Sequence, residues 1–359
     1  MKKLLKLISH RHFWPLVVVA VFAILAGRTL LTPGYFNMHD DLQMMRQLEM
    51  EKCFKDGQIP CRWIPDMGYG FGFPLFNFYP PLPYLIGQGI RLLSFSFVDT
   101  AKLTFLLSFL VSGVTMYLLA KEFFGKTGGV VSSIFYVWAP YHAVDVFVRG
   151  AMNEAWALAW FPLILWTSYR LIKEKKKLTK WIVGLALAWF ALFTSHNLMV
   201  LIFAPIFALW CLIFLRQKRW KTVPYLVGSG ILALALSAFF TLPAILEQKL
   251  VQVDTLIRGY YEYIAHFVSI NQLLFSRFWG YGASVWETND GMPFQIGHLH
   301  WILSLVLLAV IIFRYIKTRK VDNPLLVAAY FLLVGWFAAF MAHSRSTPIW
   351  QALPPLKFV

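Results

Sequence analysis

Charged side chains are scarce in this sequence of 359 residues: Asp, Glu, Lys and Arg make up only 14% of it, whereas apolar residues make up 59%. The mean hydropathy is +0.61. A soluble domain of this length and composition would expose large apolar patches and aggregate. The composition therefore excludes a soluble globular protein and predicts an all-α protein whose helices cross a membrane several times.

Cysteine is also scarce, with three residues at Cys53, Cys61 and Cys211. Their spacing does not fit a zinc cluster. Cys53 and Cys61 share one polar stretch, where a disulfide and two free thiols fit equally well. The sequence further lacks internal repeats, low-complexity tracts and a separate soluble domain, so residues 1–359 are predicted to form a single integral membrane domain. The polar-to-apolar ending at residues 356–359 suggests a piece of a longer protein with further helices.

Apolar runs long enough to approach the roughly 20 residues of a membrane span recur along the chain. The first run has no small-residue cleavage site before Tyr35 and is longer than the core of a signal peptide, so we expect a retained helix. The segment 81–97 begins with prolines and carries Arg91, which favours an amphipathic or re-entrant segment at the interface. The nine predicted spans are residues 13–31, 103–120, 128–146, 155–172, 181–195, 198–215, 224–244, 298–316 and 324–342.

The basic residues fix the predicted orientation. With nine spans, the connections on one side carry 20 of the 33 Lys and Arg residues but only 3 of the 17 acids. Cytoplasmic loops carry such an excess, so the N-terminus, with Lys2 to Arg11, and the cluster Lys173 to Lys180 are predicted to be cytoplasmic. Counting 81–97 as a tenth span would break this pattern. The net charge of +16 is thereby explained without a nucleic-acid partner.

Two large loops are predicted on the extracytoplasmic side, at residues 32–102 and 247–297. Both are rich in Trp, Tyr, Phe, Gly and Pro, which build compact turns over a membrane surface. The first loop begins with His39, Asp40 and Asp41 just beyond the first span. Carboxylates at that boundary can reach a lipid-borne substrate, although two solvated loop aspartates would give the same pattern.

Further candidates lie on the same predicted face. Arg149 and Glu154 lie between two predicted spans. The guanidinium of Arg149 can bind a lipid phosphate with two hydrogen bonds. Alternatively, it can pair with Asp145 or Glu154 and hold the helix ends together. His196 and Asn197 occupy a tight connection and can bind phosphate or a sugar hydroxyl, or simply end a helix. The second loop adds the polar candidates His266, Glu287, Asp290, Gln295, His298 and His300.

The sequence resembles known proteins at two levels. An N-terminal helix, an acidic pair at the head of a long outer loop and many further helices resemble the GT-C class of glycosyltransferases. More specific motifs are similar to bacterial membrane proteins labelled 6-pyruvoyl-tetrahydropterin synthase-related. These motifs are DGQIPCRWIP at 56–65, GYGFGFPLF at 68–76, FYPPLPY at 78–84, DVFVRGA at 145–151 with Glu154, and MPFQIGH at 292–298. The soluble synthase uses a compact zinc site of three histidines, and no such domain is present here.

The GT-C resemblance implies transfer of a sugar from a polyprenyl-phosphate carrier to a cell-envelope acceptor. Asp40 or Asp41 would act as the catalytic base, or bind a divalent cation such as Mg²⁺ or Mn²⁺. His39, Arg149, Glu154, His196, Gln295 and His298 would bind the substrate. The alternative is a non-catalytic transporter or polyprenyl-lipid-binding protein. The gathering of polar residues at one membrane face favours the transferase, because transporters keep such groups near mid-membrane.

Overall fold

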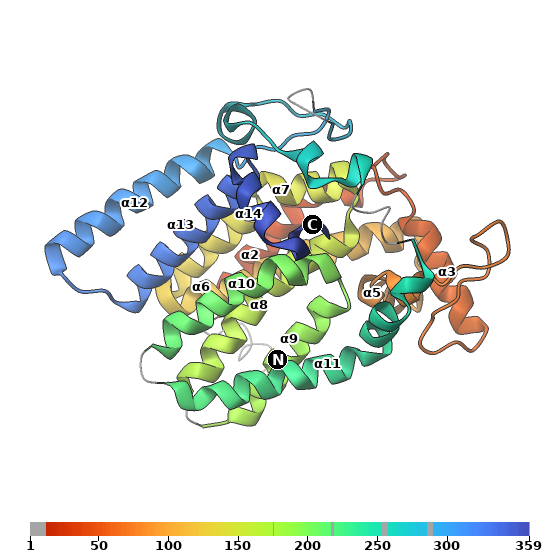
Figure 1. Cartoon of the computed structure of the whole chain (residues 1–359), viewed down its shortest axis with the longest axis horizontal. Coiled ribbons are helices and arrows are strands. Elements are labelled where there is room, and N and C mark those ends of the chain that lie inside the picture. The colour runs from red at the N-terminus through yellow and green to blue at the C-terminus, as the bar shows by residue number, and fades with distance from the viewer. Residues whose placement is uncertain (1–11, 175, 217–218, 253–257, 286–289, 359) are drawn as a thin grey trace.

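The computed structural model describes residues 12–174, 176–216, 219–252, 258–285 and 290–358, and the elements within these ranges are helical. The longer helices are α2 (Phe13–Ala26), α3 (Gln43–Lys55), α5 (Leu82–Arg91), α6 (Phe97–Val137), α8 (Met152–Lys173), α9 (Leu178–Phe193), α10 (Asn197–Leu215), α11 (Val223–Leu246), α12 (His298–Thr318) and α13 (Asn323–Met341) (Figure 1). The short segments are η1 (Arg28–Leu31), α4 (Leu75–Phe78), α7 (Pro140–Ala143), η2 (Val144–Arg149), η3 (Trp220–Thr222), η4 (Gln248–Leu250), η6 (Gly259–Tyr261), η7 (Tyr263–His266), η8 (Asn271–Phe275), η9 (Ser344–Ser346), α14 (Thr347–Ala352) and η10 (Pro354–Phe358).

Each of the nine predicted spans lies largely within helix. In the described part of the chain, 5 helical segments are long and apolar enough to cross a membrane: Phe97–Val137, Asn197–Leu215, Trp220–Leu246, His298–Thr318 and Asn323–Met341. Helices α2 and α9 are apolar but shorter. The structure is therefore that of a helical protein that crosses the membrane several times. The number of nine membrane crossings and their orientation stay predictions.

Helix α6 is two helices joined at Gly125, where the backbone leaves the helical region (φ 70°, ψ −174°). The two halves lie side by side and run antiparallel, as shown by the hydrogen bond that Ser133 Oγ donates to the carbonyl of Gly113 at 2.8 Å. They correspond to the separate spans predicted at 103–120 and 128–146, but the second half ends at Val137, and the rest of the second predicted span lies in the short segments α7 and η2. The first half begins earlier than expected, at Phe97, because the Ser96 hydroxyl caps it by accepting a hydrogen bond from Asp99 N at 3.0 Å.

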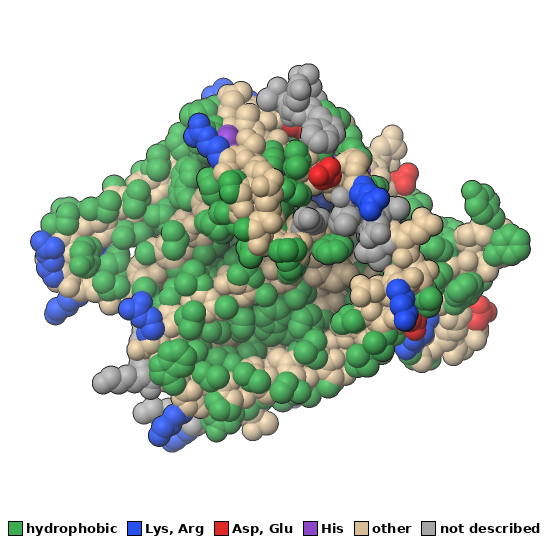
Figure 2. Space-filling model, in the orientation of Figure 1, with side chains coloured by type: hydrophobic (Ala, Val, Ile, Leu, Met, Phe, Trp, Pro, Cys, Tyr) green, Lys and Arg blue, Asp and Glu red, His purple; other side chains and the backbone are tan. Residues whose placement is uncertain are grey.

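The helices pack around α6 and α8. Helices α2 and α8 contact α6, α9 contacts both α8 and α11, and α10 contacts α8. Helix α12 packs mainly beside α13, at the edge of the molecule in Figure 1, and none of its side chains is buried. Such an apolar surface suits contact with lipid. In Figure 2 the visible acidic side chains lie on the side of the first and second loops, whereas the broad surface between the ends is mostly apolar.

The first loop is folded onto the bundle. Helix α5 lies within the segment expected at 81–97 and ends at Arg91; it buries Tyr84, Gly87 and Ile90 at helical spacing, and its place at the membrane interface stays a prediction. Helix α3 was not expected. Cys53 and Cys61 form a disulfide, which decides between the two alternatives left open by the sequence. Disulfides persist outside the reducing cytoplasm, so this bridge favours the predicted extracytoplasmic placement of the loop.

Candidate functional site

The two constellations singled out in the sequence lie side by side. The segment at His39 and Asp40 runs along the segment at 148–150, with His39 N donating to the carbonyl of Val148 at 3.0 Å and Asp40 N to that of Arg149 at 2.9 Å. Gly150 has a positive φ of 63°, and a Cβ there would meet Met38 Sδ at 2.2 Å. A glycine is therefore needed for this close approach.

The Asp40 carboxylate is held by one of its oxygens. Oδ2 accepts hydrogen bonds from Arg46 Nη1 at 2.6 Å, from Gln43 Nε2 at 3.0 Å and from the Tyr79 hydroxyl at 3.3 Å. Oδ1 has no such bond within the described residues, and the side chain remains 30% exposed. The carboxylate is thus fixed in orientation and keeps an oxygen available for a substrate.

The side chains that position Asp40 belong to a buried polar network on α3 and its neighbours. Gln43 also donates to the Gly150 carbonyl at 2.7 Å and accepts from the Tyr84 hydroxyl at 2.6 Å. Arg46 lies over the Tyr79 ring, 4.3 Å from its centroid. Burial raises the pKa of Tyr79 to about 12, although Arg46 acts to lower it, so the hydroxyl keeps its proton and can donate.

This network was missed by the sequence reasoning, which placed no helix at 43–55. A signal was present: Gln43, Arg46, Gln47, Met50 and Cys53 are buried and recur at helical spacing. The spacing marks a core-facing stripe, but most of its members are polar. Hydrophobic periodicity alone therefore does not reveal it.

The other residues at the head of the loop differ from Asp40. Asp41 is exposed and makes no hydrogen bond or ion pair with the part of the chain that the structure describes. His39 Nε2 donates to the carbonyl of Tyr281 at 3.1 Å, which links this segment to the second large loop. No group of three His, Cys, Asp or Glu side chains gathers in metal-binding fashion within the described ranges.

Arg149 is paired with both neighbouring acids. Its Nη1 lies 2.9 Å from Asp145 Oδ1 and 2.7 Å from Glu154 Oε2, and it donates to the Tyr141 hydroxyl at 2.9 Å. Tyr141 in turn donates to Glu154. The stapling interpretation is therefore realised in the structure. The Nε and Nη2 atoms make no hydrogen bond to described residues, and 33% of the side chain is exposed, so a second edge of the guanidinium remains open.

His196 caps α10, with Nδ1 accepting a hydrogen bond from Met199 N at 3.3 Å. Burial lowers the pKa of this imidazole, with a raising contribution from Glu154 and a lowering one from Arg149. His196 therefore lies within electrostatic reach of the Arg149 cluster. Its neighbour Asn197 is exposed at the start of the helix, and its Oδ1 accepts from Leu198 N at 3.1 Å.

The second loop covers the same end of the bundle. Met292 packs with Val144 and Val148 of η2, and Phe294 packs against them. The side chains of Gln295 and His298 are partly buried but form no hydrogen bond or ion pair within the described chain, so the structure does not join them to Asp40 or Arg149. Glu287 lies outside the described residues.

Three other polar residues of the second loop have structural partners. His266 Nδ1 and the Ser284 hydroxyl lie 2.8 Å apart, and Asp290 Oδ2 accepts from Gln272 Nε2 at 2.6 Å. His300 Nε2 donates to the carbonyl of Phe135 at 3.0 Å. These three side chains hold the loop and the start of α12 in place.

Comparison of the sequence with known proteins identifies a family of membrane proteins. Residues 76–359 match a family described as "6-pyruvoyl-tetrahydropterin synthase related domain; membrane protein". A protein of Lactococcus lactis subsp. cremoris (strain MG1363), named only "Uncharacterized protein", is 22% identical over 339 residues, which cover 89% of this chain and 52% of that protein. The chain thus spans about half the length of this curated relative. Because the family match covers most of the chain, from the middle of the first loop onward, the protein belongs to this 6-pyruvoyl-tetrahydropterin synthase-related family of membrane proteins.

Proposed function

We propose that the protein is a GT-C-like glycosyltransferase, which moves a sugar from a polyprenyl-phosphate carrier to a cell-envelope acceptor on the extracytoplasmic face. The observation that carries the proposal is the meeting of three segments at one end of the helices. The segment of Asp40 pairs with that of Arg149, and His39 connects it to the second loop at Tyr281. A transferase needs an oriented carboxylate beside a phosphate-binding cation.

The reaction would use these groups as follows. Asp40 accepts the proton of the acceptor hydroxyl through Oδ1 as the hydroxyl oxygen forms a bond to the anomeric carbon. The bond from that carbon to the carrier phosphate breaks, and the phosphate leaves with the electron pair. The open edge of Arg149 would stabilise the developing phosphate charge, with Glu154 holding the guanidinium in place and His196 nearby.

Of the remaining proposed substrate ligands, Gln295 lies in the second loop and His298 is the first residue of α12; both are close in sequence to the part of that loop that packs on η2. An adjustment of this loop on binding would bring them to the sugar. Asp41, exposed beside Asp40, would orient the acceptor or hold a divalent cation together with the substrate.

A non-catalytic polyprenyl-lipid-binding protein or transporter is the second candidate. The ion pair between Asp40 and Arg46 at 2.6 Å favours this second candidate, because a carboxylate can be paired for structural reasons alone. However, the described polar network lies at one end of the helices, whereas transporters place substrate sites near the bilayer midplane.

Substitution of Asp40 separates the two candidates. We expect Asp40→Asn to lower transfer by about 10²- to 10⁴-fold, the usual contribution of a general base, while binding of the carrier is kept. The full chain would be reconstituted in liposomes with polyprenyl-phosphate carrying radiolabelled glucose or mannose. Release of the labelled sugar to water or to added envelope glycans would be followed. Asp41→Asn is assayed in parallel because either carboxylate can be the base.

Asp56→Asn is the matched control, since Asp56 is an exposed acid of the same loop at the end of α3. It should transfer sugar at the wild-type rate. If both the Asp40 and Asp41 variants fold and transfer at that rate too, the glycosyltransferase mechanism is wrong and carrier binding or transport is preferred.

A further inference from the structure

A cavity of about 450 Å³ lies at the end of the bundle remote from Asp40. Its walls come from His12 before α2, from the Gly125 turn of α6, and from the ends of α8 and α9 that meet at 170–181. Asp40 follows α2 and Glu154 stands in the first turn of α8, so these helices separate the cavity from the proposed transferase site. Its size falls in the range of about 300–1,000 Å³ typical of small-molecule sites.

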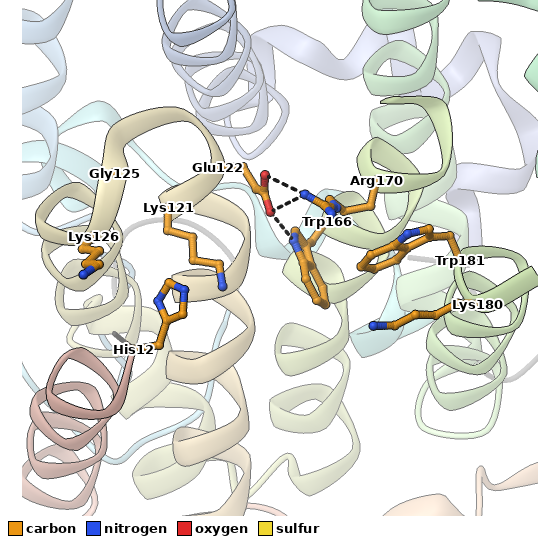
Figure 3. A pocket seen from close by; sticks show the side chains of 9 residues that line it. All are labelled: His12, Lys121, Glu122, Gly125, Lys126, Trp166, Arg170, Lys180 and Trp181. Carbon is orange, nitrogen blue, oxygen red and sulfur yellow. Dashed lines mark hydrogen bonds and ion pairs between the residues drawn. The ribbon is translucent and has the colours of Figure 1, made fainter. Parts of the chain in front are cut away.

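The lining of this cavity is strongly basic. It contains Lys121, Lys126, Arg170 and Lys180 against a single acid, Glu122. That acid is already engaged, because it accepts from Trp166 Nε1 at 3.1 Å and lies 3.4 Å from Arg170 Nη1. Lys126 and Lys180 have no ion pair within the described chain. Figure 3 shows Lys121 and Lys180 extending toward one another from opposite walls, with Trp166 between them and Trp181 beside Lys180.

Like charges directed into one hollow repel each other, so an anion placed between them would be favourable. The positive-inside pattern explains why basic residues occupy these loops, yet it requires only that they face water on the cytoplasmic side. It does not require that basic residues from separate loops line one common cavity. A phosphate group, with several acceptor oxygens and a negative charge, matches ammonium and guanidinium donors.

The aromatic part of the lining indicates an amphiphilic ligand. Trp166 and Trp181 pack edge to face at 5.3 Å, and the Arg170 guanidinium lies 5.0 Å from the Trp181 ring centroid. Tryptophan at the end of apolar helices belongs at the level of lipid head groups. The membrane leaflet on the side predicted to be cytoplasmic carries anionic lipids that attract basic residues.

We propose that this cavity binds the phosphate head group of an anionic membrane lipid, at a site separate from the proposed transferase site and on the opposite side of the membrane. Lys121 and Lys180 contact the phosphate oxygens from two walls. Arg170 stays paired with Glu122 and supports Trp181. The assignment is independent of whether the protein transfers sugar.

Thermal unfolding of the full chain in neutral detergent tests this site. We expect phosphatidic acid and phosphatidylglycerol to raise the unfolding midpoint, and diacylglycerol, which lacks the phosphate, to leave it unchanged. In the double variant Lys121→Gln/Lys180→Gln the lipid concentration for half of the maximal shift should rise about tenfold or more, because both lysines that attract the anionic head group lose their charge.

The control is Lys176→Gln/Lys320→Gln, which removes the same charge at the predicted cytoplasmic end but outside the cavity lining. It should respond as the wild type does. Inorganic phosphate and glycerol 3-phosphate are tested separately: stabilisation by them through Lys121 and Lys180, without an effect of lipid, would identify a free phosphate as the ligand instead. Equal responses of both double variants, or no stabilisation of the wild type by any of these ligands, would overturn the site.

Discussion

At the scale of single residues, the charges of Asp40 and Arg149 are each held in place by neighbouring polar side chains. Both were recognisable because a charge beside an apolar span is costly unless it is paired or used. Arg46 and Tyr79 were not, since Arg46 lies in a stretch of mostly polar residues and Tyr79 in an aromatic, proline-rich one. Only the fold shows that both donate to the same oxygen of Asp40. A pairing set by tertiary contact has no local pattern to reveal it.

Replacement of Arg149 by lysine distinguishes phosphate binding from a purely structural ion pair. An ammonium can keep contact with Asp145 or Glu154 but cannot offer a second, planar edge to a phosphate. We expect Arg149→Lys to bind polyprenyl phosphate about tenfold or more weakly, measured with tritiated lipid on the purified chain. Thermal stability is the control: a variant that melts earlier but binds the lipid normally would show that Arg149 only joins the helix ends.

His196 should make stability depend on pH. Burial lowers its pKa in the folded chain below the usual 6.5 of the unfolded chain. At a pH between the two pKa values, the imidazole is therefore protonated in the unfolded chain and neutral in the folded chain. Stability from this residue is therefore complete above pH 6.5 and is lost as the pH falls below it. Protonation would also remove the Nδ1 acceptor that caps α10.

The variant His196→Asn isolates this effect, because asparagine caps a helix without titrating in this range. We expect the fall in melting temperature between about pH 7.5 and about pH 5.5 to be smaller in the variant than in the wild type. The carboxylates titrate in both proteins and cancel in the comparison. An equal fall in both would mean that the imidazole does not govern acid stability.

At the scale of elements, the long apolar runs of the sequence located most of the longer helices closely. The predictions 198–215 and 324–342 correspond to α10 at Asn197–Leu215 and α13 at Asn323–Met341, because His196 and Asp322 cap the helices where the apolar runs begin. Helix α3 escaped prediction because its buried face is polar. The pairing of residues 39–40 with 148–149 was also beyond the sequence, since it depends on contacts between distant segments.

Gly150 controls how these segments meet. A Cβ at this position would lie 2.2 Å from Met38 Sδ and 2.9 Å from the Asp40 carbonyl, and the positive φ of 63° adds strain. We expect Gly150→Ala to destabilise the fold by about 1–2 kcal/mol from the backbone alone and to shift Asp40 away from Arg149. Chemical denaturation of the purified protein measures the first effect and lipid binding the second.

Gly228→Ala is the matched control, because a Cβ at Gly228 meets no atom within 4 Å and the residue lies inside α11. It should leave stability unchanged or raise it slightly, since alanine favours a helix over glycine. Equal stability of the two variants would show that the close approach at Gly150 is not under steric constraint.

At the scale of the whole molecule, the two ends of the bundle differ in chemistry. One end carries the oriented Asp40, the paired Arg149 and the disulfide between Cys53 and Cys61. The other end carries the basic cavity with Lys121 and Lys180. Charge counting assigns the first end to the outside and the second to the cytoplasm. Both proposed sites depend on that orientation, because a polyprenyl-linked sugar and an anionic inner-leaflet lipid are met on opposite sides.

Cysteine labelling tests the orientation directly, and the native cysteines give little background because Cys53 and Cys61 are bridged and Cys211 is buried. A cysteine replacing Lys176 should react with a membrane-impermeant maleimide only after the membrane is permeabilised. The matched position is Lys249, exposed in the second loop, whose replacement should react in intact cells. Labelling of the cysteine at position 176 in intact cells would show that the orientation is the reverse of the predicted one. The disulfide would then lie in a reducing compartment and Asp40 would face the cytoplasm. The polyprenyl-linked sugar and the anionic lipid would each have to be assigned to the opposite side of the membrane.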